Sequence, residues 1–230
     1  MIGRLYKIVK RLALSFFMLT ITSVFIMKVL PIPVTPVMIG RVFEGLIDGK
    51  FVGIHKSWRS YEDISPWAFR AFISGEDGRF MRHHGIDWRA VKVAQRYNEI
   101  YKGRKKRGAS TVTMQTAKNA FLCHSRNYLR KALEVYFVFL IEPVWGKKRI
   151  LEVYANIVEF GEGIYGVEAA SQEFFNKSAD KLTKRQAALL AAVLPNPHRW
   201  SPAKPTSYLL GRVAFIRGRM GGIAIPKPEE

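Results

Sequence analysis

Glu76 is the carboxylate in this 230-residue sequence whose surroundings best suit a general base. In a helix predicted over residues 66–83, Glu76, Phe80 and His83 are spaced by four and three residues and share one face, with Asp77 turned about 100° away. Partial burial beside an aromatic ring would raise the pKa of Glu76 toward the range that general-base catalysis needs. On spacing alone, a surface glutamate on an ordinary amphipathic helix is the simpler interpretation.

A second group of polar residues, GASTVTMQ at positions 108–115, precedes a predicted helix. Gly108 permits a tight backbone turn, while Ser110, Thr111 and Gln115 supply neutral groups suited to sugar hydroxyls and phosphate oxygens near a helix start. Ordinary helix capping explains a Ser-Thr pair equally well.

A third group contains Arg130, Lys131 and Glu134. Arg130 and Glu134 are four residues apart, so they could form a plain surface ion pair worth only a few tenths of a kcal/mol. The neighbouring histidines, His83 and His84, have no recognised metal-ligand spacing, and a structural hydrogen-bonding role is the favoured interpretation of His83.

The elements that must position these residues are predicted to be mainly helical, because apolar residues recur at three- and four-residue spacing. Ser65 before Pro66 and Thr183 before an apolar run are typical helix starts, and Gly85 is typical of the residue after a helix end. No strongly alternating segment after residue 60 predicts a strand. The predicted helices cover residues 66–83, 110–120, 127–142, 147–158, 164–173 and 183–194.

The N-terminal part of the chain is predicted to anchor it in a membrane. Residues 12–27 form an uncharged apolar run, and residues 12–30 reach about the length that spans a bilayer if the Lys28 side chain extends to the interface. Four bases lie in residues 1–11, so the positive-inside rule predicts that this tail is cytoplasmic and that the chain after Pro31 lies outside. A cleaved signal peptide is the alternative, but VLPIPVTP contains no small-residue cleavage site.

The remaining domain boundaries follow from composition. Prolines at positions 31, 33 and 36 predict a stiff, extended linker over residues 31–56. A folded domain is expected over residues 57–220 and a flexible tail over 221–230. The single cysteine, Cys123, excludes an internal disulfide and a multi-cysteine metal site.

The formal net charge of +19 predicts an anionic partner. Nucleic acid, anionic lipid headgroups and phosphorylated substrates all satisfy that condition. If the basic domain lies outside the membrane, nucleic acid is not expected as a partner, whereas membrane lipids and lipid-linked phosphates are.

Five ordered segments give the sequence a family resemblance over about residues 57–220. EDGRFMRHHG at 76–85 resembles the ED-x-x-F-x-x-H-x-G signature of the peptidoglycan glycosyltransferases at every fixed position. GASTVTMQ resembles G-x-S-T-x-T-Q-Q, with Met114 in place of a glutamine, and residues 130–134 resemble R-K-x-x-E. KKRILEVYAN at 147–156 resembles K-x-x-I-L-E-x-Y-L-N, with Ala155 in place of leucine, and AALLAAVLPNPHRWSP at 187–202 looks most like the monofunctional branch.

The resemblance implies a lysozyme-like, two-lobed, mainly α-helical domain, one lobe of which dips into the membrane beside a single N-terminal transmembrane helix. It implies that Glu76 and Glu134 are the active-site carboxylates. It also implies that substrate is bound by residues of the first three segments and of the intervening bases: Asp77, Phe80, His83, Ser110, Thr111, Gln115, Lys118, Arg126, Arg130 and Lys131. The bases among them would stabilise a lipid-linked pyrophosphate, the leaving group.

The implied reaction joins lipid II units into β-1,4-linked glycan strands, with inversion at the donor carbon and release of undecaprenyl pyrophosphate. Implied partners are lipid II, the growing glycan chain and membrane lipids, with cell-division or elongation proteins as further candidates, at the bacterial inner membrane with the catalytic domain on its periplasmic face. Many members use magnesium or manganese; no organic cofactor is expected. Two alternatives stay open: a lysozyme-like lytic enzyme, and a non-catalytic membrane-tethered scaffold that binds polyanions.

Overall fold

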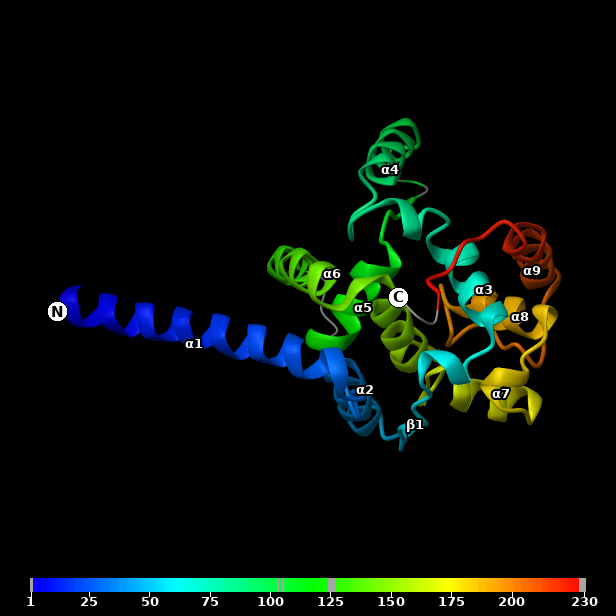
Figure 1. The fold of residues 1–230 in the computed structure, drawn as a ribbon, viewed down its shortest axis with the longest axis horizontal. Helices are drawn as coiled ribbons and strands as arrows, with labels where there is room; N and C mark the ends of the chain where they lie inside the picture. The colour runs from blue at the N-terminus through cyan, green and yellow to red at the C-terminus, as the bar shows by residue number, and fades with distance from the viewer. Residues whose placement is uncertain (1, 103, 105, 124–126, 228–230) are drawn as a thin grey trace.

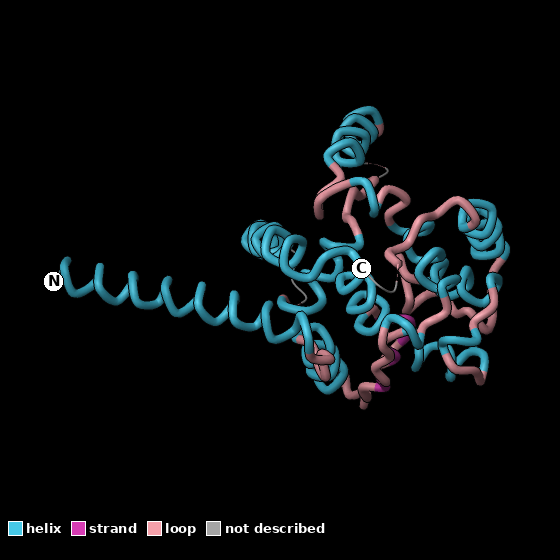
Figure 2. Tube along the Cα trace, viewed as in Figure 1, coloured by secondary structure: helices cyan, strands magenta, loops and turns pink. Residues whose placement is uncertain are grey.

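The computed structural model of the protein describes residues 2–102, 104, 106–123 and 127–227. Within these residues it contains nine α-helices, three short 3-10 helices and three strands of two or three residues (Figure 1, Figure 2). The prediction of a mainly α-helical fold with one apolar N-terminal helix is confirmed.

The order of the elements is as follows. The α-helices are α1 (Ile2–Val29), α2 (Pro36–Ile47), α3 (Pro66–Glu76), α4 (Trp88–Ile100), α5 (Val112–Phe121), α6 (Tyr128–Ile157), α7 (Val167–Phe175), α8 (Lys184–Val193) and α9 (Ser207–Met220). The 3-10 helices are η1 (Tyr61–Asp63), η2 (Phe80–Arg82) and η3 (Ala179–Lys181), and the strands are β1 (His55–Lys56), β2 (Glu159–Gly161) and β3 (Ile164–Tyr165).

Helix α1 projects away from the rest of the molecule (Figure 1). Its segment Gly3–Val29 has a mean hydropathy of 2.0 and is long and apolar enough to cross a membrane. The C-terminal half of α1 contacts α6: Trp145 Nε1 donates to the carbonyl of Val24 at 2.8 Å, and the hydroxyls of Thr20 and Tyr136 are 2.8 Å apart. The predicted anchor at residues 12–30 is therefore the C-terminal part of a longer helix.

The segment predicted as an extended linker contains helix α2, so that prediction is wrong beyond Thr35. Thr35 caps the helix by accepting a hydrogen bond from the Met38 amide at 3.3 Å, and Pro36 occupies the first turn. Proline lacks an amide hydrogen, but the first turn needs none, so Pro36 starts a helix here and does not break one. Ile32 and Met38 are fully buried, so the packed domain begins before residue 57.

The helices pack in two groups. One group consists of α1, α2, α5 and α6, and the other of α3, α7, α8 and α9, while α4 stands apart from both (Figure 1). A small sheet of order β1-β3-β2 joins segments that are far apart in sequence. Strand β1 is parallel to β3, and β2 is antiparallel to β3. These strands are too short to show the alternating pattern that predicts a strand.

The C-terminal residues 221–227 lie against the domain, unlike the flexible tail that was predicted. Tyr61 Oη donates to the carbonyl of Pro226 at 2.7 Å, and Arg70 Nη1 donates to that of Ile223 at 2.8 Å. The structure also contains α4 and α9, which the apolar spacing did not predict. Helix α9 completes the packing around α3 and α8 and, as shown below, contributes to the site.

Candidate active site

Glu76 is the last residue of α3, which ends there and not at residue 83. Asp77 leaves helical geometry (φ −155°, ψ 68°), and Phe80 belongs to the separate turn η2. The prediction that Glu76, Phe80 and His83 share one helical face is therefore wrong. The Asp77 carboxylate contacts His83 and the Val112 amide, both outside α3, and the chain turns away from the helix axis at Asp77.

The Glu76 side chain is 12% exposed and its two oxygens have different partners. Gln115 Nε2 on α5 donates to Oε2 at 3.0 Å, and Arg212 Nη2 on α9 donates to Oε1 at 3.2 Å. Burial raises the pKa of Glu76, and the hydrogen bond from Gln115 and the charges of Arg212 and Lys118 counteract that rise in part. The site thus contains a carboxylate whose environment favours the uptake of a proton, as a general base requires.

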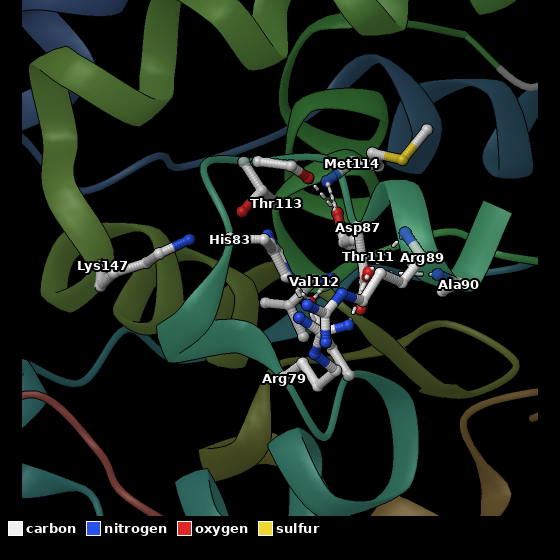
Figure 3. Close-up of polar contacts among 12 residues, drawn as sticks. Arg79, His83, Asp87, Arg89, Ala90, Thr111, Val112, Thr113, Met114 and Lys147 are labelled. Carbon is white, nitrogen blue, oxygen red and sulfur yellow. Dashed lines mark hydrogen bonds and ion pairs between the residues drawn. The ribbon is translucent and has the colours of Figure 1, made fainter. Parts of the chain in front are cut away.

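Hydrogen bonds connect the loop after Glu76 to the start of α5. His83 Nε2 lies 3.0 Å from each oxygen of Asp77, and the Val112 amide donates to Asp77 Oδ2 at 3.0 Å. Thr111 Oγ1 donates to the carbonyl of Gly85 at 2.5 Å, beside His83 (Figure 3). This contact with Asp77 fits the structural hydrogen-bonding role that sequence reasoning favoured for His83, and its role in substrate binding stays a prediction.

Four of the predicted substrate-binding residues are buried, namely Asp77, Phe80, His83 and Thr111. Hydrogen bonds of Asp77, His83 and Thr111 hold the loop in place, and contact of the four residues with substrate stays a prediction. Ser110, by contrast, is exposed and lines a cavity beside Glu76. Gln115 contacts the Glu76 carboxylate directly.

A second cluster of predicted residues forms where α5 meets the start of α6. The Glu134 side chain is buried and accepts from Arg130 Nη1 at 2.7 Å and from Lys131 Nζ at 2.6 Å. Burial lowers the pKa of Lys118, aided by the charges of Arg130, Lys131 and Arg41, while Glu134 acts in the opposite direction. A bound anion would therefore stabilise the charged ammonium form of Lys118. Arg126, predicted to belong to this cluster, lies outside the described residues.

Cavities lie on both sides of the Glu76–Gln115 contact, each of about 370 Å³. The first includes Gln115 and Lys118 and is closed by residues of α2, of β2 and of the loop after α8: Arg41, Glu159, Asn196 and His198. The second includes Glu76 and Ser110 and has arginines from three segments in its wall: Arg79, Arg107 and Arg219. A two-part substrate could therefore meet at Glu76.

Comparison with known proteins assigns the family. The sequence model described as Transglycosylase matches residues 47–221. The chain belongs to this family. A biosynthetic peptidoglycan transglycosylase of Bdellovibrio bacteriovorus is 46% identical over 223 residues, covering 97% of this chain and 88% of the relative. Proteins of the same name from Rhodospirillum centenum and Shewanella oneidensis are 46% and 43% identical, covering 96% and 100% of this chain and 92% and 98% of those relatives.

The transglycosylase is thus a glycosyl-transferring enzyme, and its site includes two arginines that sequence reasoning missed. Arg212 contacts Glu76 from α9, and Arg41 on α2 lies close enough to Lys118 to affect its pKa. A signal for the first existed: Leu209, Val213 and Ile216 are spaced by four and three residues and buried, which is the pattern of a helix. Arg212 adjoins that buried face.

The carboxylates of the site bear on how the transglycosylase could hold a divalent cation. The described part of the chain contains no group of three or more His, Cys, Asp or Glu side chains that could hold a metal ion. Both oxygens of Glu134, the carboxylate expected to help hold one, already accept from Arg130 and Lys131. These side chains do not form a metal cage.

Proposed function

We propose that this transglycosylase polymerises lipid II into β-1,4-linked glycan strands of peptidoglycan. The observation that carries the proposal is Glu76, a buried carboxylate with a raised pKa between two polar cavities. The name of the relatives, biosynthetic peptidoglycan transglycosylase, gives peptidoglycan as the polymer and biosynthesis as the direction of the reaction. The family alone would leave the residues unassigned.

In the proposed reaction, Glu76 removes the proton from the 4-hydroxyl of the acceptor sugar. The acceptor oxygen attacks C1 of the donor sugar as the bond from C1 to the diphosphate oxygen breaks, which inverts the configuration at C1. Undecaprenyl pyrophosphate leaves with the bonding electron pair, and Glu76 later returns its proton to solvent. Gln115 and Arg212 hold the two carboxylate oxygens, which fixes the direction in which the base points.

The negative charge that develops on the leaving group needs fixed cations. Lys118 is suited to this role because its ammonium is held in buried surroundings beside Arg130 and Lys131. Glu134 holds Arg130 and Lys131 in place by ion pairs of 2.7 and 2.6 Å, so we assign it to orienting these bases. Cations fixed in advance stabilise a transition state without reorganisation.

The two cavities suggest a division of the substrates. The cavity with Lys118 and Arg41 would take the donor and its diphosphate, and the cavity with Ser110 would take the acceptor. Their meeting point is the Glu76–Gln115 contact. Because arginines line both cavities, this division rests on Lys118, which lies in the first cavity and is close enough to Arg130, Lys131 and Glu134 for their charges to affect its pKa.

We further propose that α1 anchors the enzyme in the inner membrane with the catalytic domain on the periplasmic side. The distribution of bases around the apolar run supports this orientation. Lipid II, the growing glycan and membrane lipids would be the partners, with division or elongation proteins as further candidates. A divalent cation, if used, would take most of its ligands from the substrate diphosphate and water.

The test compares the full chain with Glu76→Gln on lipid II and on finished glycan. We expect chain growth from lipid II, reduced by at least about a hundredfold in the variant. Glu173→Gln, an exposed glutamate on α7, is the matched control and should retain full activity. Shortening of finished glycan without growth would instead support a lytic enzyme. Equal rates for the wild type and Glu76→Gln would refute the assignment of the base.

A further inference from the structure

A third cavity, of about 540 Å³, lies away from the two described above, at the kink in α6. Pro143 lies inside α6, and Gly146 has a left-handed backbone (φ 67°), so the helix changes direction there. The cavity opens between this kink and the turn after Glu76 that contains Met81, Arg82 and His84. Nothing in the proposed reaction uses it.

The contacts between α6 and α1 place this cavity at the level of the membrane. Going along α6, Tyr136 meets Thr20, Trp145 meets Val24, and Arg149 donates to the carbonyl of Met27 at 2.8 Å. The cavity-lining part of α6 lies between these contacts, so it is level with the last third of α1. Lys28 ends the apolar run of α1, so in a membrane that α1 spans as proposed above the cavity would lie near the boundary between lipid chains and headgroups.

The mouth of the cavity is apolar. Phe139 on α6 is 61% exposed and Met81 is 40% exposed, and both line the cavity. Large apolar side chains left exposed at the level of a membrane boundary fit a hydrocarbon chain.

Basic side chains also line the cavity. Lys147 points toward the His83 ring (Figure 3) and is paired with Glu142, so its charge is balanced. Arg82 and His84 are exposed, and among the described residues neither side chain has an acidic partner. His83 is only 8% exposed, yet its Nδ1 has no hydrogen-bond partner in the described part of the chain. The cavity therefore combines the Arg82 charge and the His84 imidazole with a buried nitrogen that has no hydrogen-bond partner.

We propose that this cavity binds the phosphate group of an anionic phospholipid from the surrounding leaflet, with an acyl chain along Phe139 and Met81. Arg82 and His84 would contact the phosphate at the mouth, and His83 would gain a partner for Nδ1. A phosphate group makes strong charge-assisted hydrogen bonds to such side chains. The site is separate from the donor and acceptor cavities and does not depend on the proposed reaction.

Lipid bound there would act on the base through positioning residues. His83 holds Asp77 through Nε2, and Asp77 accepts from the first amide of α5, the helix that contains Gln115. Fixing the His83 ring from its second nitrogen would therefore steady the contact between Gln115 and Glu76. Anionic lipid should increase the rate of glycan synthesis.

The test uses the full chain in nanodiscs of phosphatidylcholine with or without phosphatidylglycerol. A photoreactive phosphatidylglycerol should label peptides from residues 81–84 or 139–147. The double variant Arg82→Gln, His84→Gln should reduce this labelling by at least about tenfold, because it removes the Arg82 charge and the His84 imidazole. It should also abolish the stimulation of glycan synthesis by phosphatidylglycerol. Arg185→Gln, an exposed arginine on α8, is the matched control.

Competition experiments on the wild type identify the ligand without relying on any variant. We expect phosphatidylglycerol to displace the probe and phosphatidylcholine or inorganic pyrophosphate to do so at least about tenfold less well. Equal displacement by phosphatidylcholine would overturn the proposal, as would labelling that survives in the double variant. Stronger displacement by a polyprenyl diphosphate would overturn it in favour of a substrate or product site. Labelling can be measured even if lipid II is not polymerised, so the two proposals fail separately.

Discussion

Replacing Arg212 with glutamine should make glycan synthesis more sensitive to acid. Arg212 Nη2 lies 3.2 Å from Glu76 Oε1, and 24% of the Arg212 side chain is exposed. Its positive charge favours the carboxylate form and opposes burial, which raises the pKa of Glu76. Without this charge the pKa of Glu76 rises further, so a smaller fraction of the enzyme has an ionised base at any pH below that pKa.

The size of the effect follows from the geometry of the pair. Unit charges about 4 Å apart interact by about 4 kcal/mol at an effective dielectric constant of about 20. Glutamine can still donate a hydrogen bond and solvent reaches the site, so we expect about a third of this energy to be lost. That loss corresponds to a decrease of about tenfold in kcat/KM on the acidic side of the pH profile.

The assay is kcat/KM for lipid II polymerisation measured between about pH 5 and pH 9. The profiles of the wild type and Arg212→Gln should differ by about tenfold at the acidic end and converge at the alkaline end, where the base is ionised in both. Arg212→Lys should restore most of the difference, and Arg217→Gln, exposed on the same helix, should have no effect. An equal loss at every pH would refute the reasoning, since it would show that Arg212 acts on substrate and not on the Glu76 charge.

Three other substitutions have defined outcomes. Gly85→Ala should lower the free energy of unfolding by at least about 2 kcal/mol, because Gly85 has φ +83° and an added methyl group would meet Val138, whereas Gly108→Ala should be tolerated because its surroundings are open. Burial lowers the pKa of Lys56 to about 8. The buried charge therefore lowers the free energy of unfolding fully below that pH, and this cost disappears toward the unfolded pKa of about 10.4. Thermal unfolding should show that Lys56→Met is stabilised relative to the wild type more at about pH 7 than at about pH 10. Lys118→Gln should lower kcat for lipid II by about a hundredfold through loss of leaving-group stabilisation, and an increase in KM alone would contradict that role.

The sequence allowed prediction of those parts of the site that lie in local patterns. Thr111 was expected near a helix start, and it caps α5 by accepting from the Met114 amide at 3.1 Å. Arg130 and Glu134 were recognised as a possible pair by their four-residue spacing, which is a property of any helix. What spacing could not show was that Glu134 is buried, since burial depends on α5 packing against α6.

The errors arose where contacts distant in sequence override local preference. Residues 66–83 have a helical pattern, but Asp77 is drawn out of the helix by the Val112 amide, 35 positions away. Arg212 reaches Glu76 across 136 positions, and no local pattern encodes that approach. The error at Pro36 was of another kind, because Thr35 before Pro36 is the same local helix-start pattern as Ser65 before Pro66 and the three closely spaced prolines were interpreted as an extended segment.

The contacts of α6 connect the membrane anchor to the chemistry. Tyr136, which meets Thr20 of α1, lies two residues after Glu134, which orients the cations proposed to stabilise the leaving group. Farther along, Arg149 donates to backbone carbonyls of Met27 and Leu30, at the end of α1 where the helix has no partners of its own for these groups. The position of α1 along α6 therefore sets the height of the cation cluster relative to the apolar run. With the lipid diphosphate leaving group proposed above, that height must match the headgroup layer, so the proposal makes α1 part of the active-site framework and not only a tether.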